Sequence, residues 1–262
     1  MPSTSRPRDP ATPRPPPGAT PRLRPAPTPR PVVVFAPHPD DAEIHLGGTI
    51  AALVRQGQPV VVIDATRGEL GSRGTAEQRA AEAAAAGKVL GLAARENLDL
   101  PDGAVPADDQ AARIHIVTML RRHAPRTVLC LSGHARHGDH QNLARLVGGA
   151  VKMAALHRFP APGTPLAGLR LWFAEAELPL TSPAFLVPLT AADWGQKMAA
   201  IRCHTSQLYQ AGVDLPATSI ATPEFLTWIE ARGRSWGHHA GAAYAEAFSG
   251  PELPVVADPT AL

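Results

Sequence analysis

Alternating apolar strands and helices in residues 32–262 predict an α/β fold, a Rossmann-like, mostly parallel sheet flanked by helices in a single domain. The stretch Val32–Phe35 is apolar without alternation, which is typical of a central strand buried on both faces. Helix-length segments separate it from later apolar runs, as right-handed crossovers between parallel strands require. At 44% hydrophobic residues, the chain can fill one sizeable core.

Each element follows from a local signal. The first helix is expected from Asp41 to about Arg55, where Gly57 ends it. Thr75 and Gln78 form a capping box that opens an alanine-rich helix. Further strands or short apolar elements are predicted at Val60–Asp64, Asn97–Leu100, Thr127–Leu131, Leu171–Ala174 and Phe185–Val187. Further helices are predicted from Asp108 to about Arg122, from about Gln141 to Ala155, from Thr190 to about Thr205, and after Thr222-Pro223.

Residues 1–31 form a proline-rich arm with six arginines and one aspartate, whereas the rest of the chain is mildly acidic. Because the arm has almost no large apolar residues, we expect it to be disordered. The acidic body gives no electrostatic case for a nucleic-acid partner. The sequence predicts neither a signal peptide nor a membrane span. Cys130 and Cys203 lie far apart in apolar or helical patterns, which favours reduced, buried thiols and a cytoplasmic protein.

Metal-competent side chains follow two of the predicted strands. His38, Asp40 and Asp41 come just after Val32–Phe35, and a histidine-rich loop follows Thr127–Leu131. That loop contains His134, His137, Asp139 and His140. Because ligands in α/β sheets bind at the carboxyl ends of strands, the two clusters predict one site.

A catalytic zinc site takes about three His, Asp or Glu ligands and keeps a position for water. His38 and Asp41 could supply two ligands, and either His140 or His45 the third. Asp40 would be the spare carboxylate that takes a proton from the water. Two further members of the loop have candidate roles. His137 could stabilise an oxyanion or donate a proton to a leaving amine, and Asp139 could orient a histidine.

Each cluster also has a plain structural interpretation. His-Pro-Asp-Asp could be only a helix-capping turn, and the histidine-rich loop only a surface feature. Their occurrence together at two strand ends favours the metal site. A Ser–His–Asp nucleophile elbow is absent, and so is the Gly-x-Gly-x-x-Gly fingerprint after the first strand. Metal-assisted hydrolysis is therefore the favoured reaction class.

The two motifs resemble those of the PIG-L/LmbE-like family of zinc-dependent N-acetylglucosaminyl deacetylases. The family signature occurs as His38-Pro39-Asp40-Asp41 and, with glycine in place of proline, as His137-Gly138-Asp139-His140. The loop Gly71–Thr75, the pair Ser206-Gln207 and the segment Gly241–Phe248 are most similar to the bacillithiol branch. The resemblance implies removal of acetate from an N-acetylglucosamine conjugate, with N-acetylglucosaminyl malate favoured.

The resemblance also implies residue roles. His38, Asp41 and His140 would be the zinc ligands, with Asp40 as the general base and His137 as the acid or oxyanion partner. Residues expected near the sugar are Arg79, Asp102, Arg73, Glu69 and His204. Without the resemblance, Arg79 could be only a helix-surface ion pair and Asp102 only a turn residue.

Family members often form trimers or hexamers, so a homo-oligomer is expected. A site of two histidines and one carboxylate also suits Fe²⁺ or Mn²⁺. Gly138, His204 and His45 depart from the family pattern. Two other functions remain open, namely deacetylation of another N-acetyl sugar (a mycothiol precursor, a chitooligosaccharide or an antibiotic intermediate) and a non-catalytic binding protein.

Overall fold

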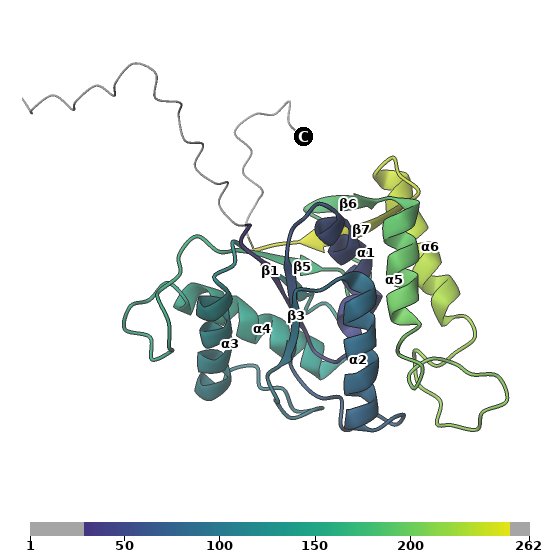
Figure 1. Ribbon diagram of the computed structural model, residues 1–262, viewed down its shortest axis with the longest axis horizontal. Helices are drawn as coiled ribbons and strands as arrows, with labels where there is room; N and C mark the ends of the chain where they lie inside the picture. The colour runs from purple at the N-terminus through teal and green to yellow at the C-terminus, as the bar shows by residue number, and fades with distance from the viewer. Residues whose placement is uncertain (1–28, 252–262) are drawn as a thin grey trace, which may run out of the picture.

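The computed structural model describes residues 29–251 (Figure 1). The proposed disordered arm, residues 1–31, lies almost entirely outside this range. The described strands are β1 Val32–Ala36, β2 Val60–Asp64, β3 Ala94–Asn97, β4 Thr127–Leu131, β5 Arg170–Ala174, β6 Phe185–Leu189 and β7 Tyr244–Ser249. The described helices are α1 Asp41–Arg55, α2 Ala76–Leu90, α3 Gln110–His123, α4 Gly138–Met153, α5 Ala191–Ile201 and α6 Phe225–His239.

All seven strands join one mixed sheet in the order β3-β2-β1-β4-β5-β7-β6. The pairs from β3 to β5 are parallel, with Val34 of β1 opposite Val62 of β2 and Leu129 of β4. β7 runs antiparallel to both β5 and β6. The sequence-based prediction of a mostly parallel α/β fold is confirmed.

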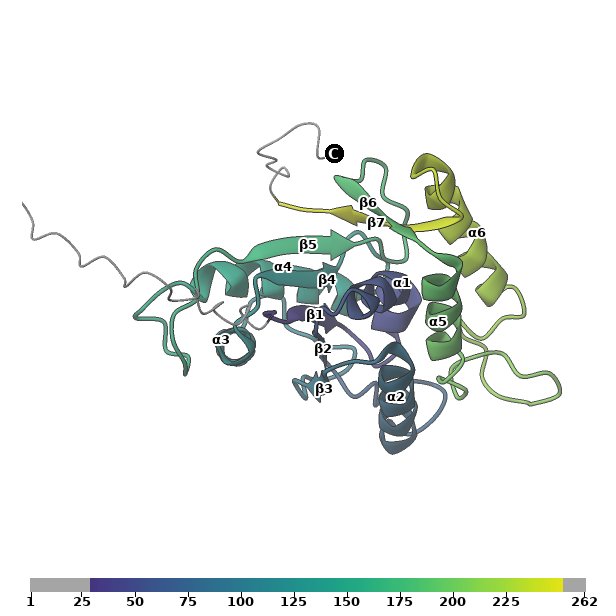
Figure 2. The same ribbon diagram turned by 45° about the horizontal axis from the view of Figure 1, so that its top comes forward.

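The two faces of the sheet bury separate apolar cores, which explains why the central strands consist mostly of apolar residues. Val33 and Phe35 point to the core under α3 and α4, whereas Val34 and Ala36 point to the core under α1 and α2. Figure 2 shows these two groups of helices on opposite sides of the sheet, with α5 beside α1 and α6 next to β7. β1 is thus buried on both faces, as its unbroken apolar pattern predicts.

The topology creates a switch point at the carboxyl ends of β1 and β4. From β1 the chain winds outward through β2 to β3, and then returns to place β4 on the other side of β1. The loops after β1 and β4 therefore leave the sheet in opposite directions, and such switch points are where open α/β sheets bind ligands. Both candidate motifs follow directly from these two strands.

Several predicted boundaries are wrong. The strand predicted at Asn97–Leu100 is β3 at Ala94–Asn97, because charged Arg95 and Glu96 hide a strand that is only half-buried. The helix expected to reach Thr205 ends at Ile201, and a turn follows it. β7 was missed, because its alanine-rich sequence carries no apolar run.

Three helix starts are also displaced. Asp109, rather than Asp108, caps α3, and its side chain accepts a hydrogen bond from Ala112 N–H. α4 begins at Gly138, earlier than expected, so the second motif lies in its first turn. α6 begins at Phe225, later than Thr222-Pro223 suggested.

Cys130 is buried, as expected, but Cys203 is only partly buried, because it lies in the turn after α5; both are free thiols. Between residues 29 and 251, the structure has no helix with the length and apolar character needed to cross a bilayer.

Candidate metal centre

The two strand-end clusters meet at the switch point, beyond the carboxyl ends of β1 and β4. The turn after β1 brings His38, and the first turn of α4 brings His140, so that their ring centroids lie 5.6 Å apart. The ring of His137 lies 4.9 Å from that of His38, on the exposed side of the cluster. The topology thus joins residues about one hundred positions apart.

Asp41 is the common partner of the two buried histidines. Its Oδ2 lies 2.9 Å from Nδ1 of His38 and 3.3 Å from Nε2 of His140. The backbone N–H of His38 donates to the same oxygen at 3.0 Å, which fixes the carboxylate. One ligand atom from each of these three residues lies within 4.8 Å of the other two, so they could hold one ion.

The other ring nitrogen of His38 faces carboxylates. Nε2 lies 3.2 Å from Oδ1 of Asp102 and 3.3 Å from Oδ2 of Asp139. Asp139 itself accepts backbone N–H groups from Gly103 at 2.8 Å and Val105 at 3.0 Å. A histidine whose Nε2–H is held by a fixed carboxylate presents Nδ1 to a metal. This arrangement supports the orienting role predicted for Asp139.

A second set, consisting of His38, His137 and Asp139, also lies within reach of a common ion. Its use would require Nε2 of His38, the nitrogen that faces Asp102 and Asp139. The side chain of His137 is 45% exposed, whereas that of His140 is 4% exposed. The geometry therefore favours the buried set of His38, Asp41 and His140.

The charge balance of the buried set fits a cation. Burial opposes the charged form of His38, yet the carboxylates of Asp102, Asp139 and Asp41 raise its pKa to about 12. Burial likewise opposes ionisation of Asp41, but His140 and His38 hold its pKa well below the usual range. Several carboxylates thus converge on two imidazoles, and a positive charge between them is strongly favoured. The donor set of two nitrogens and one oxygen suits zinc.

His45 occupies a different position from the three candidate ligands. Its Nε2 lies 3.7 Å from Oδ1 of Asp41, on the far side of the carboxylate from His38 and His140. Burial lowers the pKa of His45 to about 3, because the attraction of Asp41 is outweighed, with the positive charges of Arg232 and Lys197 adding to the effect. His45 belongs to neither of the two sets that could hold an ion.

Asp40 lies beside the candidate metal ligands with its carboxylate facing an arginine. Nη2 of Arg79 is 3.3 Å from Oδ1 of Asp40, and Nη1 donates to the carbonyl of Gly68 at 3.0 Å. A Cβ at Gly68 would lie 2.1 Å from Nη1, and the residue has φ +67°, so the loop requires glycine there. Arg79 was predicted near the sugar; the structure places it against Asp40, and both side chains are buried.

The structure separates the other predicted substrate residues into two groups. Asp102 and Glu69 are linked next to His38: the buried Asp102 lies 3.2 Å from Nε2 of His38 and accepts the N–H of Leu70 at 2.8 Å, and Glu69 accepts the N–H of Asp102 at 2.9 Å. Arg73 and His204 are buried. Nε2 of His204 lies 3.4 Å from Oε2 of the buried Glu43. Contact of all five with a sugar stays a prediction.

Sequence reasoning missed Arg95 in β3. Its guanidinium forms a bidentate pair with Asp64 at 2.7 and 3.0 Å and contacts Glu43 at 2.6 Å. It also donates to the carbonyl of Pro39 at 2.9 Å. Arg95 therefore supports the motif turn from behind. No sequence signal was available, because the strand was predicted at Asn97–Leu100 and Arg95 lies before it.

The pair Ser206-Gln207, which resembles the family pattern, connects two parts of the structure. Glu82 of α2 accepts the backbone N–H of Ser206 at 2.8 Å and its hydroxyl at 2.7 Å. The amide of Gln207 donates to the carbonyl of Arg73 at 2.6 Å. The segment after α5 is thus tied to the glycine-rich loop that encloses Arg79.

These positions give a direct test of the third ligand. We expect His140→Ala to lose most of its zinc in dialysis against zinc that saturates the wild type, because one of the nitrogens facing the ion is lost. His45→Ala should keep more zinc than His140→Ala at that concentration, since its ring faces the other carboxylate oxygen. Zinc content measured by mass spectrometry checks this. Loss of zinc only in His45→Ala would make His45 the ligand.

Comparison with known proteins agrees with this geometry. Residues 33–151, which include both motifs, match the PIG-L family described as GlcNAc-PI de-N-acetylase. The crystal structure of the conserved protein TT1542 from Thermus thermophilus is similar over 87% of this chain and 97% of that one, with 38% identity and a TM-score of 0.78. Both motifs of the candidate metal centre thus lie in the part of the chain that matches the PIG-L family.

Two curated relatives carry activity names. The diacetylchitobiose deacetylase of Thermococcus kodakarensis is 33% identical over 49% of this chain. The 1D-myo-inositol 2-acetamido-2-deoxy-alpha-D-glucopyranoside deacetylase of Rhodococcus opacus is 30% identical over 53% of this chain. The matches span 51% and 59% of the lengths of those relatives.

Proposed function

We propose that this chain is a zinc-dependent N-deacetylase, a hydrolase that cleaves the amide of an N-acetylglucosamine conjugate to acetate and a free amine. The observation that carries the proposal is the buried set of His38, Asp41 and His140 at the switch point, with Asp40 beside it. The PIG-L match and the names of both curated relatives support the reaction class.

His38, Asp41 and His140 would hold the metal. When bound, zinc would polarise the amide carbonyl and lower the pKa of a water to about 7. Fe²⁺ or Mn²⁺ could take the same place, because the donor set does not distinguish them.

The chain's own residues would then move the protons. Asp40 accepts a proton from the water whose oxygen attacks the amide carbon. His137, which is exposed, donates a proton to the amide nitrogen as the C–N bond breaks, or stabilises the developing oxyanion. Asp139 keeps the His38 ring in place, and Arg79 keeps Asp40 in place.

The substrate favoured within this class is N-acetylglucosaminyl malate, as in bacillithiol biosynthesis, on the similarity of the loop Gly71–Thr75 and the pair Ser206-Gln207. The names of the curated relatives favour two alternatives, a diacetylchitobiose and an inositol glycoside of N-acetylglucosamine. A cytoplasmic location and a trimer or hexamer stay predictions that go with this assignment.

Acetate release tests the proposal. Purified chain with zinc should release acetate from N-acetylglucosaminyl malate, and kcat/KM compared with diacetylchitobiose and the inositol glycoside ranks the three substrates. Faster turnover of either alternative would change the substrate but keep the reaction. If the metal-loaded chain releases no acetate from any of them, a non-catalytic binding protein becomes the better interpretation.

A further inference from the structure

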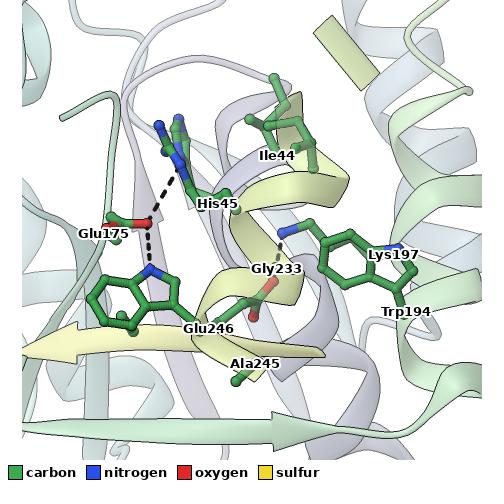
Figure 3. A pocket seen from close by; sticks show the side chains of 12 residues that line it. Ile44, His45, Glu175, Trp194, Lys197, Gly233, Ala245 and Glu246 are labelled. Atoms are coloured by element: carbon green, nitrogen blue, oxygen red, sulfur yellow. Dashed lines mark hydrogen bonds and ion pairs between the residues drawn. The ribbon is translucent and has the colours of Figure 1, made fainter. Parts of the chain in front are cut away.

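The proposed mechanism gives His45 no task, although its side chain is only 8% exposed and lies next to the metal centre. Figure 3 shows His45 lining a small cavity together with Glu175, Lys197 and Glu246. The cavity measures about 20 Å³, which is room for about one water. It is therefore too small for a sugar, and the role of His45 must be sought in the side chains that it faces.

His45 faces the oxygen of Asp41 that the candidate ligands leave free. Oδ2 of Asp41 meets Nδ1 of His38 and Nε2 of His140, whereas Oδ1 has Nε2 of His45 at 3.7 Å. This distance is an electrostatic contact, and a shift of less than about 1 Å would make it a hydrogen bond. An imidazole nitrogen that faces a carboxylate oxygen can carry a hydrogen and donate it to that oxygen.

Distant parts of the chain fix the position of this ring. α1 is interrupted directly after His45, at Leu46, whose φ of −139° is not helical. Glu246 of β7 accepts the N–H groups of Gly48 and its neighbour at 3.1 and 2.7 Å, which starts the second part of the helix. Lys197 of α5 pairs with Glu246 at 2.6 Å, as Figure 3 shows. A Cβ at Gly48 would lie 2.3 Å from Cδ1 of Leu189, so the close approach requires glycine.

We propose that His45 is a positioning residue of the metal centre, whose Nε2–H holds Oδ1 of Asp41 so that Asp41 binds the metal through Oδ2 alone. The inference rests on the metal site of the proposed function. A carboxylate held in this way occupies one coordination position and leaves another for water. Outer partners of this kind raise metal affinity by about 10–100-fold.

Three substitutions separate this role from simple packing. In His45→Gln, the side-chain amide nitrogen can reach the place of Nε2 and donate to Oδ1. In His45→Asn, the amide is shorter and reaches only the place of Nδ1, so it serves as the matched polar control. His45→Leu fills the space without any donor. Circular dichroism and thermal melting of the metal-free variants show that each is folded.

The readouts are zinc affinity, measured by chelator competition, and the visible spectrum of the Co²⁺-loaded chain. We expect His45→Asn and His45→Leu to weaken zinc binding about 10–100-fold and His45→Gln to stay within about threefold of wild type. Co²⁺ absorption should fall in the two weak binders, because Asp41 can then bind through both oxygens and raise the coordination number.

Two outcomes would overturn the inference. Wild-type affinity and spectra in all three variants would leave His45 without a role at the metal. Equal loss in His45→Gln and His45→Leu, as severe as in His140→Ala, would make His45 itself a ligand. The measurements use no sugar. A chain that binds zinc with the expected pattern but releases no acetate would therefore refute the proposed function and keep this inference.

Discussion

Asp40→Asn is expected to keep the metal and to lose turnover, with kcat lower by a factor of about 100 to 10,000. Asparagine has the same shape as aspartate but cannot accept the proton of the attacking water. The metal stays because the facing donor atoms belong to His38, Asp41 and His140. Acetate release at saturating substrate, together with zinc content of the same preparation, measures both effects.

The matched control for this prediction is Asp108→Asn, the same chemical change at a side chain that is 84% exposed and far along the chain from both motifs. Its kcat should equal that of the wild type. Two results would contradict the assignment of Asp40. Full activity in Asp40→Asn would remove its role as base, and loss of zinc in that variant would make it a ligand.

Local sequence patterns were sufficient for the central part of the fold. The unbroken apolar runs of β1, β2 and β4 predict strands buried on both faces, and the intervening helices predict their parallel order. The patterns were insufficient at the sheet margins. β3 is charged and half-buried, and β7 is alanine-rich, so tertiary pairing rather than composition makes them strands.

The candidate site, like the fold, was predictable from the sequence only in part. That His38 and His140 would meet was predictable, because both follow strands of one sheet and the carboxyl ends of those strands share an edge. The sequence did not predict which oxygen of Asp41 each ring faces. The residues alone also left open whether His140 or His45 is the third ligand. The support of Arg95 for the motif turn depends on β3 lying beside β2, a contact that no local pattern encodes.

Removing Arg95 gives the second large expected effect, this time on stability. Arg95→Met leaves the buried carboxylates of Asp64 and Glu43 without their cation, and breaking a buried pair costs about 3–5 kcal/mol. For a domain of this size the melting temperature should fall by about 6–20 °C. The matched control is Arg67→Met, because Arg67 is half exposed and its partner Glu77 is exposed, so its melting temperature should change little.

The loss should depend on pH with a definite sign. Burial raises the pKa of Asp64 to about 6 even with Arg95 beside it, whereas Arg95 and His204 hold the pKa of the buried Glu43 below its usual value. Without Arg95, the pKa of Asp64 rises further above that of the unfolded chain, and the pKa of Glu43 rises as well. The folded variant then binds more protons than the unfolded chain, so its stability falls as pH increases through this range. Melting curves of the metal-free chains should therefore show a larger gap between wild type and Arg95→Met at pH 8 than at pH 5. If the difference in melting temperature is equal at both pH values, or below about 2 °C, then solvent rather than Arg95 stabilises the charges of Asp64 and Glu43. In that case the turn that carries Asp40 and Asp41 would depend on another support.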